Sequence, residues 1–250
     1  MPPHFSREFH GNSFGLFGKP SYIPQYRGSR LGTRRHPSCR TASELQQRII
    51  VLIEGLNDPG DRAFALSGLG ARLAGLAPQL QQRLIVLVEG LNDPKDRATA
   101  LWDFGPGVAG LALAPELQQR LVGLVEGLDD PEYRGSTLMA LGASFAGCAP
   151  ELQHRLVGLV EGLDDPQYRG WALSGFGASV AGFAPELQHR LVGLVEGLDD
   201  IQDCVCALNG LGAGRAGLAR ELQHRLVNFA SGLVWPIHRA CALAALLPRR

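Results

Sequence analysis

The sequence predicts an all-α fold, an α-solenoid of six roughly 35-residue helix-turn-helix repeats over residues 44–250, preceded by a disordered basic tail over residues 1–43. Both halves of each unit place apolar residues at helical spacing. A single helix pair cannot bury such a face, so the copies are expected to stack around one continuous core. The motif L-Q-x-R recurs with its arginines 35, 37, 35, 35 and 35 residues apart, at Arg48, Arg83, Arg120, Arg155, Arg190 and Arg225.

The first half of each unit is expected to form a helix, as the fourth copy, residues 149–183, illustrates. Pro150 suits the first helical position, because no N–H is needed there. Gly162 is expected to close the helix in the left-handed conformation, and Leu163 then folds back on the preceding turn. The spacing of three, four and seven places one apolar face on Leu152, Leu156, Leu159, Val160 and Leu163.

In the first five units a second helix is expected to begin after an Asn-Asp or Asp-Asp pair, whose second residue caps it with its side chain. The predicted caps are Asp58, Asp93, Asp130, Asp165 and Asp200. The predicted core face consists of the stem of Arg169 and of Ala172, Leu173, Phe176 and Val180. Gly175 and Gly177 lie beside this face inside the helix, where glycine costs about 1 kcal/mol against alanine. Their recurrence predicts a place where backbones approach closely.

The segment D-P-x-x-R-x-x-x-L-x-x-L-G occurs at residues 58–70 and, with Phe at the second Leu, at residues 93–105 and 165–177. It resembles the turn and second helix of HEAT repeats, most of all the short bacterial HEAT-like kind. The resemblance implies that the Asp and Arg stabilise the turn and link neighbouring repeats, and it names no active site. The fifth unit departs from the pattern, with Ile201 for Pro and Cys204 for Arg, so the same turn is not predicted there.

The sixth unit is expected to be an end cap, because Val234 and Trp235 replace its acidic pair. A terminal repeat needs a polar outer face. The helix that includes residues 241–247 is less polar than such a cap requires, so either the tail or a partner is expected to cover it.

A partner-binding surface is predicted where the copies differ from one another. At 100° per residue, the fixed positions of the second helix point inward and the variable ones nearly the opposite way. The variable positions carry apolar side chains, and aromatic anchors often dominate interfaces. The hypothesis assigns partner binding to Phe64, Trp102, Met139 and Trp171. Self-association, or partial burial of these residues by superhelical curvature, is an equally weighted alternative.

Metal, cofactor and catalytic chemistry are not predicted. His154, His189 and His224 form a row one repeat apart, too far apart to share a zinc ion. Cys204 and Cys206 are two apart on a helix, which is poor geometry for chelation, whereas Cys206 and Cys241 occupy equivalent positions and could come close as free thiols. The glycine-rich fragments lack the Lys-Ser/Thr of a phosphate loop. We therefore expect no enzyme activity and no cofactor.

Charge is divided unevenly along a chain whose net charge is zero. The tail carries seven basic residues against Glu8 and is +6, so residues 44–250 are −6. The acidic pairs form a row that disfavours nucleic acid on that edge but could meet a basic partner. The tail suits electrostatic pairing with the acidic body, RNA contact, an organellar address or secretion of a bacterial effector.

The leading hypothesis is a soluble, cytoplasmic and non-enzymatic scaffold that binds a protein partner of unknown identity, with self-association possible. The alternatives are a nucleic-acid-associated protein that uses the basic tail, and a HEAT-like lyase or regulatory subunit. An odd number of cysteines without framework spacing is typical of a reducing compartment. The sequence contains no run of about 18 apolar residues, so no membrane span is predicted.

Overall fold

The computed structural model describes residues 42–70, 72–105, 114–145 and 147–247. Within these ranges the chain is all-helical, as predicted, and has no strand. The expected disordered tail lies outside the described residues. None of the helices in the described ranges is long and apolar enough to cross a membrane.

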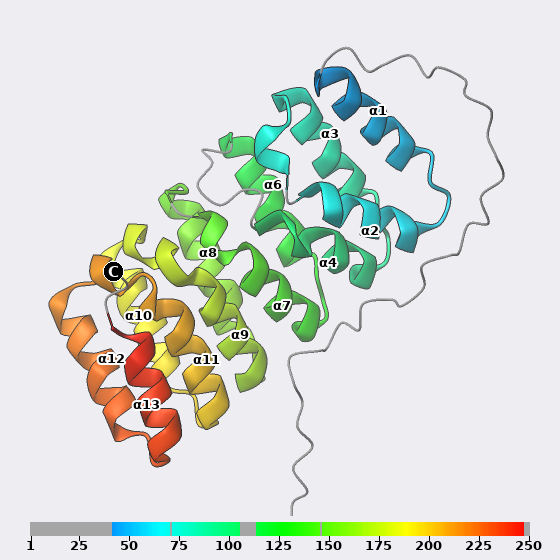
Figure 1. Cartoon of the computed structure of the whole chain (residues 1–250). Coiled ribbons are helices and arrows are strands. Elements are labelled where there is room, and N and C mark those ends of the chain that lie inside the picture. The colour runs from blue at the N-terminus through cyan, green and yellow to red at the C-terminus, as the bar shows by residue number, and fades with distance from the viewer. Residues whose placement is uncertain (1–41, 71, 106–113, 146, 248–250) are drawn as a thin grey trace, which may run out of the picture. The chain divides into compact units, whose positions relative to one another are not determined.

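Each repeat unit supplies two α-helices (Figure 1). The first helices are α1 (Ala42–Glu54), α3 (Pro78–Glu89), α6 (Pro115–Glu126), α8 (Pro150–Glu161), α10 (Pro185–Glu196) and α12 (Arg220–Gly232). The second helices are α2 (Pro59–Gly70), α4 (Pro94–Trp102), α7 (Pro131–Leu141), α9 (Pro166–Phe176), α11 (Ile201–Gly212) and α13 (Pro236–Ala245). Short 3₁₀ helices follow four of the second helices, namely η1 (Leu73–Gly75), η2 (Gly142–Phe145), η3 (Gly177–Gly182) and η4 (Arg215–Gly217).

The first helices end differently from the prediction. The φ angle of Gly162 is −77°, so this residue is not left-handed, and the equivalent Gly90, Gly127 and Gly197 also have negative φ. The N–H of Gly162 donates to the Gly158 carbonyl, and the N–H of Leu163 donates to the Val160 carbonyl, which tightens the last turn. Leu163 and Asp164 then lead to Asp165, the extended cap residue of the next helix, and none of these residues is left-handed. Leu163 is buried, as predicted.

The turn between the two helices of a unit is held by the arginine of the second helix. The Arg169 guanidinium donates to the Leu163 carbonyl at 2.6 Å, and Arg134 reaches the Leu128 carbonyl at 2.7 Å. The thiol of Cys204 donates to the equivalent Leu198 carbonyl at 3.3 Å in the fifth unit. That unit therefore keeps the turn that the sequence left unpredicted.

Helices of the same kind contact one another in the order of the units (Figure 1). Each first helix contacts the first helix of the next unit, from α1 through to α12. Each second helix likewise contacts the next second helix, from α2 through to α13. We call these two series the first-helix row and the second-helix row.

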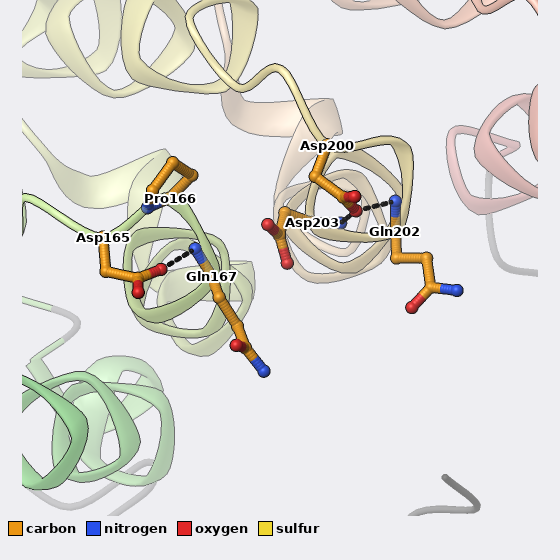
Figure 2. A pocket seen from close by; sticks show the side chains of 6 residues that line it. All are labelled: Asp165, Pro166, Gln167, Asp200, Gln202 and Asp203. Atoms are coloured by element: carbon orange, nitrogen blue, oxygen red, sulfur yellow. Dashed lines mark hydrogen bonds between the residues drawn. The ribbon is translucent and has the colours of Figure 1, made fainter. Parts of the chain in front are cut away.

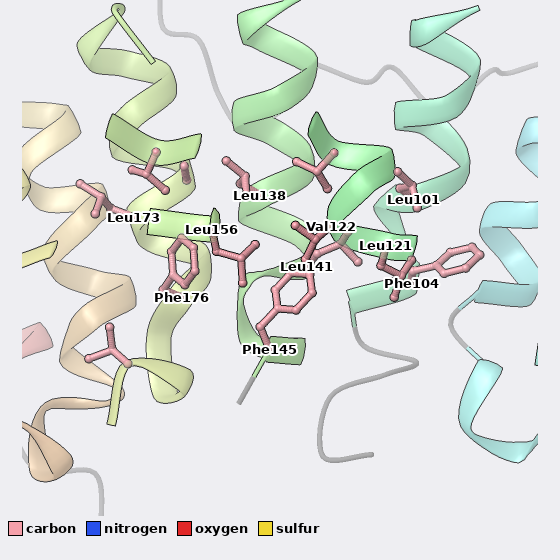
Figure 3. Packing of buried hydrophobic residues seen from close by; sticks show 14 of the residues in the cluster. Leu101, Phe104, Leu121, Val122, Leu138, Leu141, Phe145, Leu156, Leu173 and Phe176 are labelled. Atoms are coloured by element: carbon pink, nitrogen blue, oxygen red, sulfur yellow. The ribbon is translucent and has the colours of Figure 1, made fainter. Parts of the chain in front are cut away.

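The core lies between the two rows and passes from one unit to the next without interruption (Figure 3). The residues at the predicted core positions Leu152, Leu156 and Val160 of α8 are buried, whereas Leu159 is half-buried. The largest buried side chains repeat at equivalent positions. In the units drawn, these include Leu101, Phe104, Leu121, Leu138, Leu141, Phe145, Leu156, Leu173 and Phe176.

Neighbouring first helices are joined by pairs of long side chains. In five pairs the Arg of L-Q-x-R meets a glutamate at the end of the preceding first helix, at 2.5 to 2.6 Å. Both side chains are partly exposed, so each pair contributes little stability. The pairs are Arg83–Glu54, Arg120–Glu89, Arg155–Glu126, Arg190–Glu161 and Arg225–Glu196.

Neighbouring second helices approach backbone to backbone, as the recurrent glycines predict. A Cβ atom added at Gly210 of α11 would lie 2.0 Å from the Ser174 carbonyl oxygen of α9. A Cβ at Gly175 would lie 2.3 Å from the carbonyl oxygen of Met139. Gly177, however, lies beyond the end of α9 rather than inside it, and its φ of +34° marks the junction with η3.

Buried glutamines hold the loops between units. Gln153 donates to the Cys148 carbonyl at 3.0 Å and to the Gly182 carbonyl at 3.3 Å, while its side-chain oxygen accepts from the Ala184 N–H. The amide of Gln188 donates to the Phe183 carbonyl at 3.1 Å. A buried carbonyl without a partner is costly, so the Gln of L-Q-x-R stabilises the loops.

Candidate functional site

The four residues predicted to bind a partner lie on four successive helices of the second-helix row, α2, α4, α7 and α9. Phe64 is 66% exposed. Trp102, Met139 and Trp171 are each half-buried. The Trp171 ring packs against the Tyr168 ring with centroids 5.4 Å apart, at a tilt of 58°.

The variable face does not point outward along its whole length. Ser67 and Ser136 occupy variable positions and are both buried. The reason is the close approach of neighbouring second helices, which covers part of this face. Ser67 donates to the Asp103 carboxylate at 2.6 Å, so one variable position joins α2 to the end of α4.

The acidic pairs lie at the turns where the second helices begin. An oxygen of Asp93, Asp165 or Asp200 accepts the backbone N–H two residues later at 2.7 to 2.8 Å. Asp130 accepts from Glu132 in the same way, whereas Asp58 accepts from the N–H of Asp61. All five predicted caps therefore make cap hydrogen bonds, which leaves the other carboxylate oxygens along this edge for further contacts.

A cavity of about 370 Å³ opens between the first turns of α9 and α11 (Figure 2). Its lining combines three carboxylates with two amides, from Asp165, Pro166, Gln167, Asp200, Gln202 and Asp203. Burial, reinforced by the carboxylates of Asp200 and Asp165, raises the pKa of Asp203 to about 6. A positively charged group entering this cavity would relieve that repulsion.

The cavity and Trp171 share one side of α9. Gln167 lines the cavity and precedes Trp171 by four residues, so both side chains lie on the same helical face. The candidate site is therefore an acidic cavity with an aromatic side chain one helical turn away. Such an arrangement suits a segment that carries a cationic side chain beside an apolar one.

Asp203 and the two glutamines of the cavity were not among the residues predicted from the sequence to form a site. A signal was present, because this position is acidic in three of the first five units, at Asp61, Asp96 and Asp203, and Tyr in the other two. Its closeness to Asp165 depends on the spacing of neighbouring second helices, which the sequence alone does not supply.

Histidine and cysteine do not add a second site to this surface. His154 lies 3.9 Å from Glu186 and is exposed. Among the described residues, no three His, Cys, Asp or Glu side chains are placed to hold a metal ion. Burial raises the pKa of Cys148 and of Cys204 to about 11, so both remain thiols at neutral pH.

Compared with known proteins, the chain matches no family model, no curated protein and no solved structure. The likeness to HEAT repeats therefore stays a prediction carried by the D-P-x-x-R segment.

Proposed function

We propose that the chain is a non-enzymatic scaffold, a short α-solenoid of HEAT-like repeats that binds a protein partner along its second-helix row. The partner supplies an extended segment with basic and apolar side chains. The observation that carries the proposal is the exposure of Phe64, an aromatic residue at a position where the copies differ.

The packing of the two rows supports a solenoid. Second helices approach to backbone contact at their glycines, whereas first helices meet through the long side chains of Arg–Glu pairs. When one row is spaced more tightly than the other, a stack of helix pairs curves with the tight row inside. The second-helix row would then form the concave surface on which repeat proteins commonly bind partners.

Charge supports a basic partner. The N-terminal ends of the second helices α4, α7, α9 and α11 carry capping carboxylates along one edge. The cavity between α9 and α11 adds Asp203. A cationic side chain in the cavity and an apolar one on Trp171 would use both features within one helical turn. Phosphate-rich nucleic acid would be repelled from the same edge.

Replacing aromatic residues tests the proposal. Phe64→Ala and Trp171→Ala are expected to reduce capture of the partner by the tagged full chain about tenfold or more, because aromatic anchors dominate interfaces. Quantitative mass spectrometry of captured proteins provides the readout. Val86→Ala is the matched control, since Val86 is 52% exposed but belongs to the first-helix row.

Unfolding curves separate binding from folding, because Trp171 also packs against Tyr168. Phe64 is mostly exposed, so its replacement should leave stability nearly unchanged. Unchanged capture by both aromatic variants, with folding intact, would rule out this surface.

The basic tail favours the second candidate function, nucleic-acid binding. Residues 1–43 carry a charge of +6 together with Phe and Tyr side chains, a combination that contacts single-stranded nucleic acid through charge and stacking. RNA binding that weakens steeply with salt and disappears on deletion of residues 1–43 would support it.

A further inference from the structure

The described first-helix row begins with an exposed apolar face on α1. Leu45 is 50% exposed and Leu52 is 70% exposed. The residues equivalent to Leu45 in the other five units are at most 5% exposed, at Leu80, Leu117, Leu152, Leu187 and Leu222. Those equivalent to Leu52 are buried or half-buried. The residue types at these positions are the same or similar in all units. The greater exposure on α1 therefore results from its position at the start of the described row.

The Arg–Glu pairs show which way this face points. In units two to six, the Arg of the first helix reaches the glutamate of the preceding first helix. Arg48 occupies this position in α1, three residues after Leu45 and four before Leu52, so the three residues share one face. It is the face that the other units turn toward the unit before them.

We propose that this face of α1 docks an amphipathic helix of a partner protein, in the way that one first helix packs on the next. The interface within the row defines the chemistry of that helix. It needs an apolar face of Leu and Val against Leu45 and Leu52, and an acidic residue toward Arg48. The apolar part carries the proposal, because burying two exposed leucines supplies the main driving force.

A second copy of the chain fits this face poorly. The sixth unit would have to present the matching end, but Ser231 stands where the five preceding units have the paired glutamate. Leu247 stands where those units have a glycine, and a Cβ at the equivalent Gly212 would lie 2.3 Å from the Ala245 carbonyl oxygen. The close contact between second helices therefore could not form across such a junction.

The probe is a peptide that reproduces residues 149–163, held helical by a hydrocarbon staple on its solvent face and verified by circular dichroism. Its sequence is that of α8 with its flanking residues, which packs on α10 in the protein. Fluorescence anisotropy with the full chain is expected to show saturable binding with Kd on the order of 10–100 µM, as suits a small interface.

Leu52→Asp is expected to weaken peptide binding about tenfold or more. Val51→Asp is the matched control and should change it less than about twofold, because Val51 is 56% exposed and lies about 100° from Leu52 around the helix. Both residues are exposed, so both variants should fold, which thermal unfolding checks.

Several outcomes would overturn the proposal. Absence of binding by the helical peptide, or binding unaffected by Leu52→Asp, would remove the face as a helix-docking site. Dimers in sedimentation that disappear in Leu52→Asp would assign the face to a second copy. Binding that appears only after residues 1–43 are deleted would assign it to that segment. Trp171→Ala should leave peptide binding unchanged, which distinguishes this face from the surface of the proposed function.

Discussion

The first-helix row and the second-helix row come from one repeating unit, yet neighbouring helices meet differently within them. First helices touch through side chains, and an added Cβ at Gly123, Gly158 or Gly193 would meet nothing within 4 Å. Second helices touch through backbone, and an added Cβ at Gly105 of this row would overlap the Ala140 carbonyl. Glycine is thus required for close packing in the second-helix row, whereas no contact between neighbouring helices requires it in the first-helix row.

The helix starts differ in the same way. In the five first helices with a described cap, that residue is an Ala followed by Pro, or by Arg in α12, and it makes no side-chain hydrogen bond. Second helices in units two to five begin at an Asp that accepts one or two backbone N–H groups. The glycine contacts and the Asp caps, which depend on one residue type, are therefore concentrated in the second-helix row. Substitutions there should destabilise the protein more than substitutions in the first-helix row.

The largest contrast is expected between glycines of the two rows. Gly210→Ala should destabilise the protein by about 3 kcal/mol, because the new Cβ would overlap the Ser174 carbonyl of the neighbouring helix. Gly193→Ala should stabilise it by about 0.5–1 kcal/mol, since it meets no neighbour and removes glycine from a helix interior. Urea unfolding of both variants measures the difference. Equal changes in stability for the two variants would contradict the difference between the rows.

Removing a cap makes a second helix begin as a first helix does. Asp165→Ala should cost about 1 kcal/mol, because the N–H of Gln167 loses its acceptor. Asp164→Ala is the control, as this neighbouring carboxylate is exposed, and should fall within about 0.5 kcal/mol of the parent. Thermal unfolding compares the two. A larger loss at Asp164 would show that the cap bond is not the source of the stability.

The acidic cavity predicts a dependence on pH. Because the folded pKa of Asp203, about 6, lies above its ordinary 3.8, the ionised carboxylate destabilises the fold above pH 6. This cost is relieved as the pH falls toward 4. Asp203→Asn should therefore stabilise the protein at pH 8 by about 1 kcal/mol, allowing for solvent screening, and by almost nothing at pH 4. Unfolding at the two pH values tests the sign, and a gain that is equal at both would contradict it.

The smallest effect is expected in the first-helix row. Glu161→Ala breaks the pair with Arg190, whose side chain is 40% exposed, and should cost about 0.3–0.5 kcal/mol. In 1 M salt the cost should shrink further, because the Debye length falls to about 3 Å. Urea unfolding at low and high salt measures it. A loss of stability above about 2 kcal/mol would show that an Arg–Glu pair of this row contributes as much as a glycine contact of the second-helix row.

Local features were predictable from the sequence, whereas contacts between units were not. The Asp caps, the helix periodicity and the glycine approach follow from residue types and spacing within one unit. The burial of Ser136 and the closeness of Asp203 to Asp165 depend on how far apart neighbouring helices lie. The left-handed ending expected at Gly162 was wrong, because hydrogen bonds from the N–H groups of Gly162 and Leu163 close the last turn with negative φ at Gly162. The turn at Cys204 was kept because a thiol can donate to the same carbonyl as a guanidinium.

The spacing of the Arg–Glu pairs has a consequence for how the chain can lengthen. The two partners lie 29 residues apart in four pairs and 31 apart in the pair Arg120–Glu89, which spans the two-residue insertion. Every junction thus presents the same two groups, whichever units it joins. Removing residues 149–183, or duplicating them, would leave the arginine of every unit after the first facing a glutamate. Gain or loss of a whole unit by recombination between its own copies would change the length of this protein and leave its junctions chemically matched.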